Sequence, residues 1–213
     1  MANVTLAERS QLHIARKLWH IFIGGGAVAI YHMGDHPLKF WGAIAFGIAV
    51  FGFALDFTRL RLPKLNETFI RAFSIILRKS ERSNFSGLPF YALGVALSIY
   101  FYQKEIALLS IYFLVFADPA SSFIGIQYGK DKILPHKSLQ GTITCFLVCF
   151  VITLLTLFES EHETSTLIAF ALLAGVFGAI SELFSAFNID DNITIPVVSG
   201  AGLSLLNYFF KIY

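Results

Sequence analysis

The chain has 213 residues, of which 56% are hydrophobic and 14% are charged, and its mean hydropathy is +0.68. Ordinary soluble domains carry about 25% charged residues, so this composition indicates a multi-spanning membrane protein. The formal net charge of +2 is small, and nothing in the composition indicates nucleic-acid binding. No repeat or low-complexity segment divides the chain, so we expect a single domain over residues 1–213.

Apolar runs of about 17 to 23 residues recur along the chain, and this is the length that a helix needs to cross the hydrocarbon core. We expect about seven transmembrane helices, near 18–33, 39–56, 87–102, 106–128, 139–158, 166–187 and 194–210. The sequence therefore predicts an all-α, polytopic membrane helix bundle, with its termini on opposite sides of the bilayer.

Lys and Arg are distributed unequally between the connections, and cytoplasmic loops carry the excess of these residues. The N-terminal stretch, the 57–86 connection and the 129–138 loop hold Arg9, Arg16, Lys17, Arg59, Arg61, Lys64, Arg71, Arg78, Lys79, Arg82, Lys130, Lys132 and Lys137. The opposite side holds Lys39, Lys104 and Lys211, and its 159–163 stretch is acidic. We therefore expect the N-terminus and 188–193 in the cytoplasm, with the chain in a cell inner membrane or an endomembrane.

The 57–86 connection is the only long one between the expected spans. Its apolar residues recur at helical spacing, and basic residues lie between them, which is typical of a helix in the headgroup layer. The apolar positions are Leu65, Phe69, Ala72, Phe73, Ile76 and Leu77, and the basic ones are Arg71, Arg78, Lys79 and Arg82. A helix packed against the bundle is the alternative. In either case the segment covers the cytoplasmic face.

The fourth expected span contains a carboxylate, and an ionisable group inside a membrane helix is by default a candidate for a functional site. Asp118, Ser122, Gly125 and Gly129 have spacings that place them along one side of a helix. Glycines on such a stripe let another helix or a ligand approach the backbone closely. Pro119 predicts a kink beside the acid. The alternative is a packing face with one buried, protonated Asp.

Basic residues and helix starts follow this span on the same side of the membrane. Lys130, Lys132 and Lys137 lie in a short loop, and Ser138 occupies an expected N-cap position before the fifth span. A second helix start is expected from Asn192, Thr194 and Pro196. Because helix N-termini attract anions, these groups predict a phosphate-binding cradle.

Acidic residues lie at the same end of the sixth span. Glu182 is inside it, and Asp190 and Asp191 follow it directly. Mg²⁺ takes one or two carboxylates and completes its shell with water and phosphate oxygens. We therefore expect a magnesium site formed from Asp118, Glu182, Asp190 and Asp191. A loop cap is the alternative for the Asp190-Asp191 pair.

The first span begins with Arg16, Lys17 and His20, which lie one helical turn apart. They are either anchors that fix the topology, or they bind phosphate and move a proton. The sequence alone leaves both alternatives open.

These residues together resemble the polyprenol kinase family, which includes dolichol kinase, phytol kinase and CTP-dependent diacylglycerol kinase and is related to CDP-diacylglycerol synthases. The resemblance covers nearly the whole chain, in order. It is carried by Arg16-Lys17-x-x-His20, Arg78-x-x-Glu81 with Gly87 and Tyr91, Asp118-Pro119-Ala120 with Gly125 and Gly129-Lys130, Lys137-Ser138 with Gly141, and Glu182 followed by Asp190-Asp191-Asn192 and Ile195-Pro196.

The resemblance implies a membrane enzyme that transfers the γ-phosphate of CTP, or of another nucleotide, to the hydroxyl of a lipid alcohol with a divalent metal. The implied catalytic residues are Asp118 and Asp191, with Asp191 the first choice for deprotonating the hydroxyl and His20 the second. The implied nucleotide and phosphate contacts are Arg16, Lys17, Gly125, Gly129, Lys130, Lys137, Ser138, Gly141 and Asn192. Partners would be the lipid alcohol, the nucleotide and the bilayer, and a homodimer is left open.

The chain departs from the wider pattern at two places. Gln140 stands where related sequences carry Glu, and Pro135-His136-Lys137-Ser138 replaces the Ser-Pro-Lys-Lys run of cytidylyltransferases. The second departure favours a kinase over a cytidylyltransferase that makes a CDP-lipid. The remaining alternative is a small ion-coupled transporter, whose inverted repeats are not visible here. Nothing in the sequence identifies the lipid alcohol.

Overall fold

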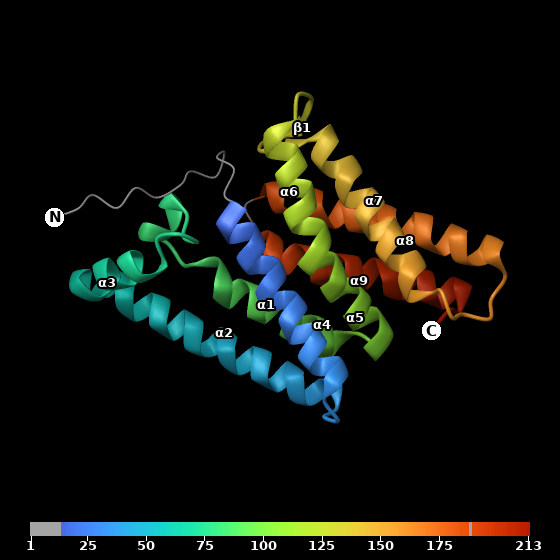
Figure 1. Cartoon of the computed structure of the whole chain (residues 1–213), viewed down its shortest axis with the longest axis horizontal. Coiled ribbons are helices and arrows are strands. Elements are labelled where there is room, and N and C mark those ends of the chain that lie inside the picture. The colour runs from blue at the N-terminus through green and yellow to red at the C-terminus, as the bar shows by residue number, and fades with distance from the viewer. Residues whose placement is uncertain (1–13, 188) are drawn as a thin grey trace.

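The computed structural model describes residues 14–187 and 189–213, so Arg9 of the expected basic set lies outside the described residues. The chain folds into helices connected by short turns (Figure 1). The helices are α1 (Ile14–Met33), α2 (Leu38–Arg61), α3 (Pro63–Phe73), α4 (Gly87–Phe101), α5 (Lys104–Tyr112), α6 (Asp118–Gln127), α7 (Leu139–Thr156), α8 (Thr164–Phe184) and α9 (Asp191–Phe210). Short strands β1 (Lys132–Leu134) and β2 (Lys137–Ser138) form an antiparallel hairpin. The all-α prediction is confirmed.

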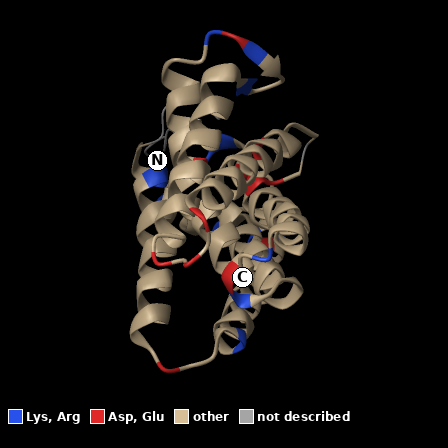
Figure 2. Ribbon diagram, turned by 90° about the vertical axis from the view of Figure 1, so that its right-hand side faces the viewer, with Lys and Arg blue, Asp and Glu red and all other residues tan. Residues whose placement is uncertain are grey.

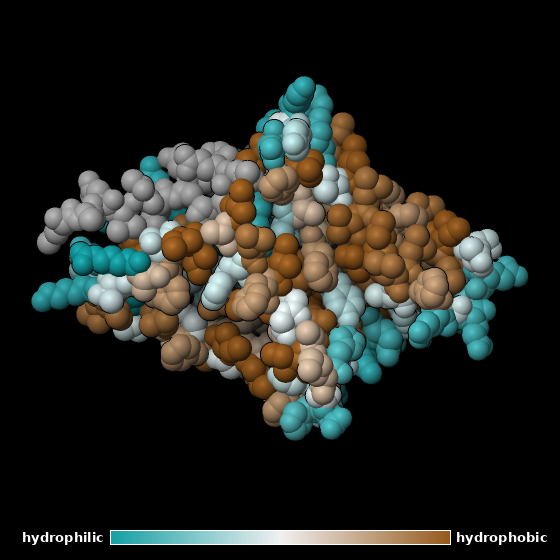
Figure 3. Space-filling model, viewed as in Figure 1, coloured by the Kyte–Doolittle hydropathy of each residue, from teal (hydrophilic) through white to brown (hydrophobic). Residues whose placement is uncertain are grey.

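Membrane-spanning helices account for most of this architecture. Within the described residues, the stretches long and apolar enough to cross a bilayer are Leu38–Arg61, Lys104–Gln127, Leu139–Thr156, Thr164–Phe187 and Asp191–Phe210. The shorter apolar α4 and the 20-residue α1 match the other expected segments. Apolar atoms cover much of the surface in Figure 3, and charged residues lie mainly at helix ends and in turns in Figure 2. The polytopic bundle is therefore confirmed, and seven crossings stay a prediction.

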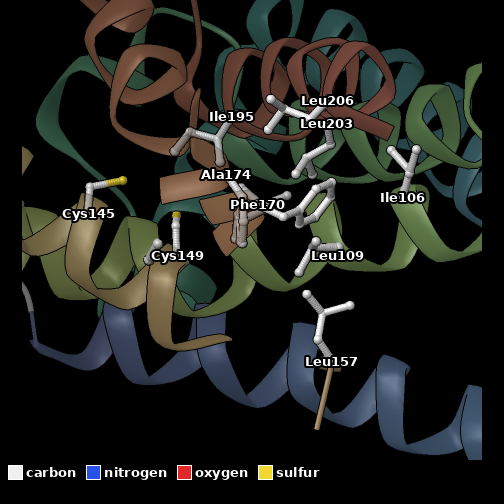
Figure 4. Packing of buried hydrophobic residues seen from close by; sticks show 13 residues of the cluster. Ile106, Leu109, Cys145, Cys149, Leu157, Phe170, Ala174, Ile195, Leu203 and Leu206 are labelled. Carbon is white, nitrogen blue, oxygen red and sulfur yellow. The ribbon is translucent and has the colours of Figure 1, made fainter. Parts of the chain in front are cut away.

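The core lies where α5, α7, α8 and α9 meet. Figure 4 shows Phe170 of α8 close to Leu109 of α5 and Leu203 of α9. Cys145 and Cys149 are fully buried on the α7 side of the same cluster. This packing holds the ends of α6, α7, α8 and α9 in one region of the bundle.

The 57–86 connection differs from the expectation in part. α2 continues to Arg61, so Arg59, which was expected in the connection, lies on this membrane-spanning helix and is buried. α3 is helical as predicted, and its Ile70 is buried while Phe73 is 42% exposed. Arg78, one of the basic residues of this connection, follows α3 and lines a cavity.

The fourth span is a compound helix, in which a π-helical segment, η2 (Phe113–Ala117), joins α5 to α6. Asp118 is the first residue of α6, and Pro119 comes just after the π-helical segment, where the regular pattern of backbone hydrogen bonds is interrupted. The stripe of Asp118, Ser122 and Gly125 is helical as expected. Gly129 is not part of it, because α6 ends at Gln127.

The ends that carry the polar residues gather on one side of the bundle. In Figure 1 the start of α1, the β-hairpin and the junction between α8 and α9 lie toward one end, away from the α1–α2 turn and the α7–α8 loop. Segments distant in sequence therefore meet at a common face, and the site is built there.

Candidate functional site

A cavity at this face collects polar side chains from segments spread over the whole chain. Its lining consists of Arg16, Lys17 and His20 on α1, Arg78 after α3, Asp118, Pro119, Ser121, Ser122, Gly125 and Ile126 on α6, Lys132, His136, Lys137 and Ser138 in the hairpin, Gly141 on α7, Glu182 on α8 and Asp191 on α9. Most of the residues expected from the sequence are thus brought together.

His20 of α1 lies beside Asp118 at one wall. Its Nε2 is 3.0 Å from the carbonyl oxygen of Leu114, and its Nδ1 is 3.9 Å from Asp118 Oδ2. Because a carbonyl oxygen only accepts hydrogen bonds, the proton must sit on Nε2. In the neutral ring, Nδ1 then keeps its lone pair facing the acid, at a distance too long for a direct hydrogen bond. Tyr91 packs edge-on against the imidazole, with ring centroids 4.7 Å apart.

Lys17 lies about one helical turn before His20 on α1. Its Nζ donates a hydrogen bond to Ser122 Oγ on α6. This contact joins α1 to the Asp118 stripe. Both Lys17 and Ser122 line the cavity, so the stripe predicted from α6 carries a cation supplied by another helix.

Small residues set the distance between α6 and α7. A methyl group on Gly141 would lie 3.0 Å from the carbonyl oxygen of Ser121 and 3.3 Å from the Cα of Gly125. Ser138 caps α7 as predicted, since its Oγ accepts a hydrogen bond from Gly141 N at 3.3 Å. Gly125 and Gly141 therefore act at least in helix packing beside the cavity.

Lys137 and Glu182 form a buried ion pair across the cavity. The distance from Lys137 Nζ to Glu182 Oε1 is 2.5 Å, and the side chains are 11% and 6% exposed. Thr142 Oγ1 donates to the second oxygen of Glu182 at 3.4 Å. The charge of Glu182 is thus compensated by the protein itself, which the sequence did not indicate because 45 residues separate the partners.

Arg16 also forms an ion pair within the protein, with Glu81. Its NH1 lies 2.9 Å from both carboxylate oxygens of Glu81 and 3.1 Å from the carbonyl oxygen of Ile76. Arg78, which sequence reasoning missed as a site residue, lines the cavity nearby. The Arg78-x-x-Glu81 spacing was a usable signal, since it places both residues on one short turn.

Several expected site residues lie outside the cavity lining. Asp190 is the N-cap of α9, and its Oδ1 accepts hydrogen bonds from Asn192 N at 3.0 Å and Asn192 Nδ2 at 2.7 Å. Burial raises the pKa of Asp190 to about 7, and the neighbouring Asp191 carboxylate adds to this shift. The capping alternative therefore describes Asp190, while Asp191 lines the cavity. Pro196 lies inside α9 rather than at its start.

Two further expected site residues, Gly129 and Lys130 at the base of the hairpin, also lie outside the cavity lining. Lys130 is exposed, and its backbone N donates to Gln140 Oε1 at 3.2 Å. Gln140 Nε2 also donates to Asp131 at 2.7 Å, so this departure from the family pattern ties the hairpin to α7. Lys132 and His136, from the same hairpin, line the cavity instead.

The expected metal ligands are only partly assembled. Within residues 14–187 and 189–213, no group of three or more His, Cys, Asp and Glu side chains is arranged to hold a metal ion. Asp118 and Asp191 line the same cavity from different helices, whereas Glu182 is paired with Lys137. A metal here would depend on ligands from a bound substrate.

A cavity with cations, carboxylates and a histidine, set at one end of a membrane helix bundle, fits transfer of a charged group to a lipid. Phosphoryl transfer in particular requires positioning and neutralisation of phosphate charge. The fold and the site together define a membrane-embedded phosphotransferase.

Comparisons with known proteins specify this class. A CTP-dependent diacylglycerol kinase from Saccharomyces cerevisiae is 33% identical over 219 residues, covering 93% of this chain and 74% of the relative. The protein of the same name from Schizosaccharomyces pombe is 31% identical, and the aligned region covers 96% of this chain and 98% of that relative. A phytol kinase from Synechocystis is 27% identical over 89% of this chain and 78% of its length. The chain therefore belongs to the polyprenol kinase family and is a membrane lipid kinase.

No family model matches the chain. No solved structure matches it either. The family assignment therefore depends on the named relatives.

Proposed function

We propose that this protein transfers the γ-phosphate of CTP to the hydroxyl of a lipid alcohol, with diacylglycerol as the first candidate acceptor. The observation that carries the proposal is the placement of Asp118 beside His20 in a cavity that is also lined by Lys17, Arg78 and Lys137. The names of the yeast relatives support CTP as donor and diacylglycerol as acceptor.

The donor phosphates would be held by the cavity cations. Lys17, Arg78 and Lys137 come from α1, the segment after α3 and the hairpin, so their charges converge from several directions. Bound to phosphate oxygens, they would stabilise the charge that spreads over the γ-phosphoryl group during transfer. The excess of Lys and Arg in the connections at this face supports a cytoplasmic site, which CTP reaches from solution.

Mg²⁺ fits the donor set formed by Asp118 and Asp191. Both are oxygen ligands on separate helices facing one cavity, which suits an ion that takes few protein ligands and fills its shell with water and phosphate. Held there, the ion would offset the negative charge of the donor phosphates. Glu182 fits this role less well, because Lys137 already occupies one of its oxygens.

The acceptor hydroxyl must lose its proton as its oxygen attacks the γ-phosphorus and the bond to the β–γ bridging oxygen breaks, releasing CDP. His20 and Asp191 both line the cavity, and we propose them as the groups that take this proton. The hydrogen bond from Nε2 to Leu114 fixes the imidazole in the tautomer that a proton acceptor needs.

The position of the transferred label tests the function. The purified protein is supplied with Mg²⁺, diacylglycerol and CTP labelled at either the γ- or the α-phosphorus, with phytol and a polyprenol in parallel reactions. We expect the γ-label, and not the α-label, to enter the lipid. In a further reaction that supplies phosphatidic acid as acceptor, transfer of the α-label with release of pyrophosphate to give CDP-diacylglycerol would indicate a cytidylyltransferase. Transfer of γ-label to phytol or polyprenol alone would reassign the acceptor.

A further inference from the structure

A buried polar network joins the end of α2 to the segment between α3 and α4, and its residues do not line the cavity. Arg59 Nε donates to Asp56 Oδ1 at 2.6 Å, and these side chains are 0% and 2% exposed. Asp56 Oδ2 accepts hydrogen bonds from Ser86 N at 2.7 Å and Ser86 Oγ at 2.8 Å. The end of α2 is thereby tied to the residue before α4.

Arg59 carries this network further, to the segment between α3 and α4. Its NH2 donates to the carbonyl oxygens of Glu81 at 3.0 Å and Asn84 at 2.9 Å. Its NH1 donates to Asn66 Oδ1 at 2.7 Å, and its guanidinium lies 4.7 Å from the ring centroid of Phe69. All three guanidinium nitrogens of this buried cation therefore donate hydrogen bonds that hold α2, α3 and the 81–84 backbone together.

Glu81 is the point where the network reaches the cavity. Its carboxylate accepts hydrogen bonds from Arg78 N at 2.7 Å and Gly87 N at 3.0 Å, in addition to the paired Arg16. Glu81 thus joins α1, the turn that carries Arg78 and the start of α4. Arg78 is the residue of this turn that lines the cavity.

Apolar packing does little to fix this turn. Leu77 is buried, but Ile75 is 71% exposed, and Lys79 and Ser80 are also exposed. A long cationic side chain on such a turn loses much conformational freedom when it binds phosphate, unless its backbone is already held. The hydrogen bonds of Glu81 and Arg59 supply that constraint.

We propose that Asp56, Arg59 and Glu81 are positioning residues that hold Arg78 at the donor-phosphate end of the cavity. The proposal rests on the proposed function, because it assigns Arg78 to the donor nucleotide. It also gives Arg16 a different role from the one expected from the sequence, since its pairing with Glu81 makes it a support for the Arg78 turn.

The test compares matched carboxylate-to-amide variants. Glu81→Gln keeps the side-chain shape but removes the charge that faces Arg16 and the backbone donors. Glu67→Gln makes the same change on α3, where Glu67 is 3.8 Å from Arg71 and both side chains are more than half exposed. We expect Glu81→Gln to raise the KM for CTP about tenfold, the effect of weakening one charge-assisted hydrogen bond, with kcat per folded molecule nearly unchanged. Glu67→Gln should leave both parameters at their wild-type values.

The separation of KM from kcat distinguishes positioning from mere structural support. A variant that only unfolds part of the sample lowers the maximal rate and leaves the KM for CTP unchanged, and that result would overturn the proposal. Direct binding of labelled CTP should weaken by the same factor as the KM rises. If Glu81→Gln cannot be recovered folded, Arg59→Lys takes its place under the same criterion, since it keeps the charge beside Asp56 but cannot reach both carbonyl oxygens.

The wild-type protein separates this proposal from the proposed function. If wild type transfers no label from CTP, the proposed function is wrong. If wild type transfers label normally and Glu81→Gln keeps the wild-type KM and affinity for CTP, only the positioning proposal is overturned.

Discussion

The ion pair between Lys137 and Glu182 offers the sharpest test of how the cavity is built. Replacing Lys137 with Met removes the ammonium group and leaves the mostly buried Glu182 carboxylate without its cation. Because the two side chains are only 11% and 6% exposed, solvent screening does little to reduce the effect. Breaking a buried pair in this way costs about 3–5 kcal/mol.

This cost appears as a lower melting temperature in detergent micelles. For a chain of this size, 1 kcal/mol corresponds to about 2–4 °C, so Lys137→Met should melt roughly 10 °C below wild type. The double variant Lys137→Met/Glu182→Gln has no unpaired charge and should recover most of the loss. A double-mutant cycle should then give a coupling of about 2 kcal/mol or more, within the range measured for residues in contact.

Additive effects of the two single changes would refute the reasoning, because they would mean that the groups do not interact in the folded protein. The exposed Glu67 and Arg71 pair is the matched control, and its cycle should give a coupling near zero. The same variants also separate two roles of Glu182. If it only neutralises Lys137, Glu182→Gln keeps Mg²⁺-dependent turnover, whereas a metal ligand would not tolerate the change.

Three further predictions concern the chemistry, the packing and the orientation of the chain. Asp118→Asn should lower turnover by orders of magnitude while the melting temperature stays near the wild-type value, and wild-type turnover would contradict its role. Gly94→Ala should destabilise the fold by about 1–3 kcal/mol in a melting experiment, because a methyl group would meet the backbone oxygen of Asn192; an unchanged melting temperature would show that the helices can separate freely. In a cysteine-free background, a cysteine at position 131 should be protected from an impermeant external reagent and one at position 161 should react, and the reverse pattern would invert the topology.

Local sequence features were sufficient for the helices and for part of the site. The apolar runs predicted each long helix, because the bilayer requires about 20 apolar residues and internal backbone hydrogen bonds. The side of α6 that carries Asp118, Ser122 and Gly125 follows from helical spacing, and the Ser138 cap follows from a residue type that accepts hydrogen bonds at a helix start. Each of these features depends on residues within a few turns of one another.

Other features of the site depend on where a helix ends and on contacts between distant segments. Arg78 was placed only among the basic residues of the 57–86 connection, but it lines the cavity, and its backbone N donates to Glu81. Gly129 lies beyond the end of α6, and Asn192 binds Asp190 rather than lining the cavity. Spacing along a helix cannot show where the helix stops or which neighbour meets it.

The sequence by itself determined that this is an all-α membrane protein, which polar residues share a face of each helix, and which family the pattern resembles. Tertiary structure alone decided that Lys137 neutralises Glu182, that Glu81 holds Arg16, and that His20 presents Nδ1 to Asp118. The physical reason is that hydrophobic length and helical period are local properties. The pairing of charges depends on how helices separated by 45 to 105 residues pack against one another.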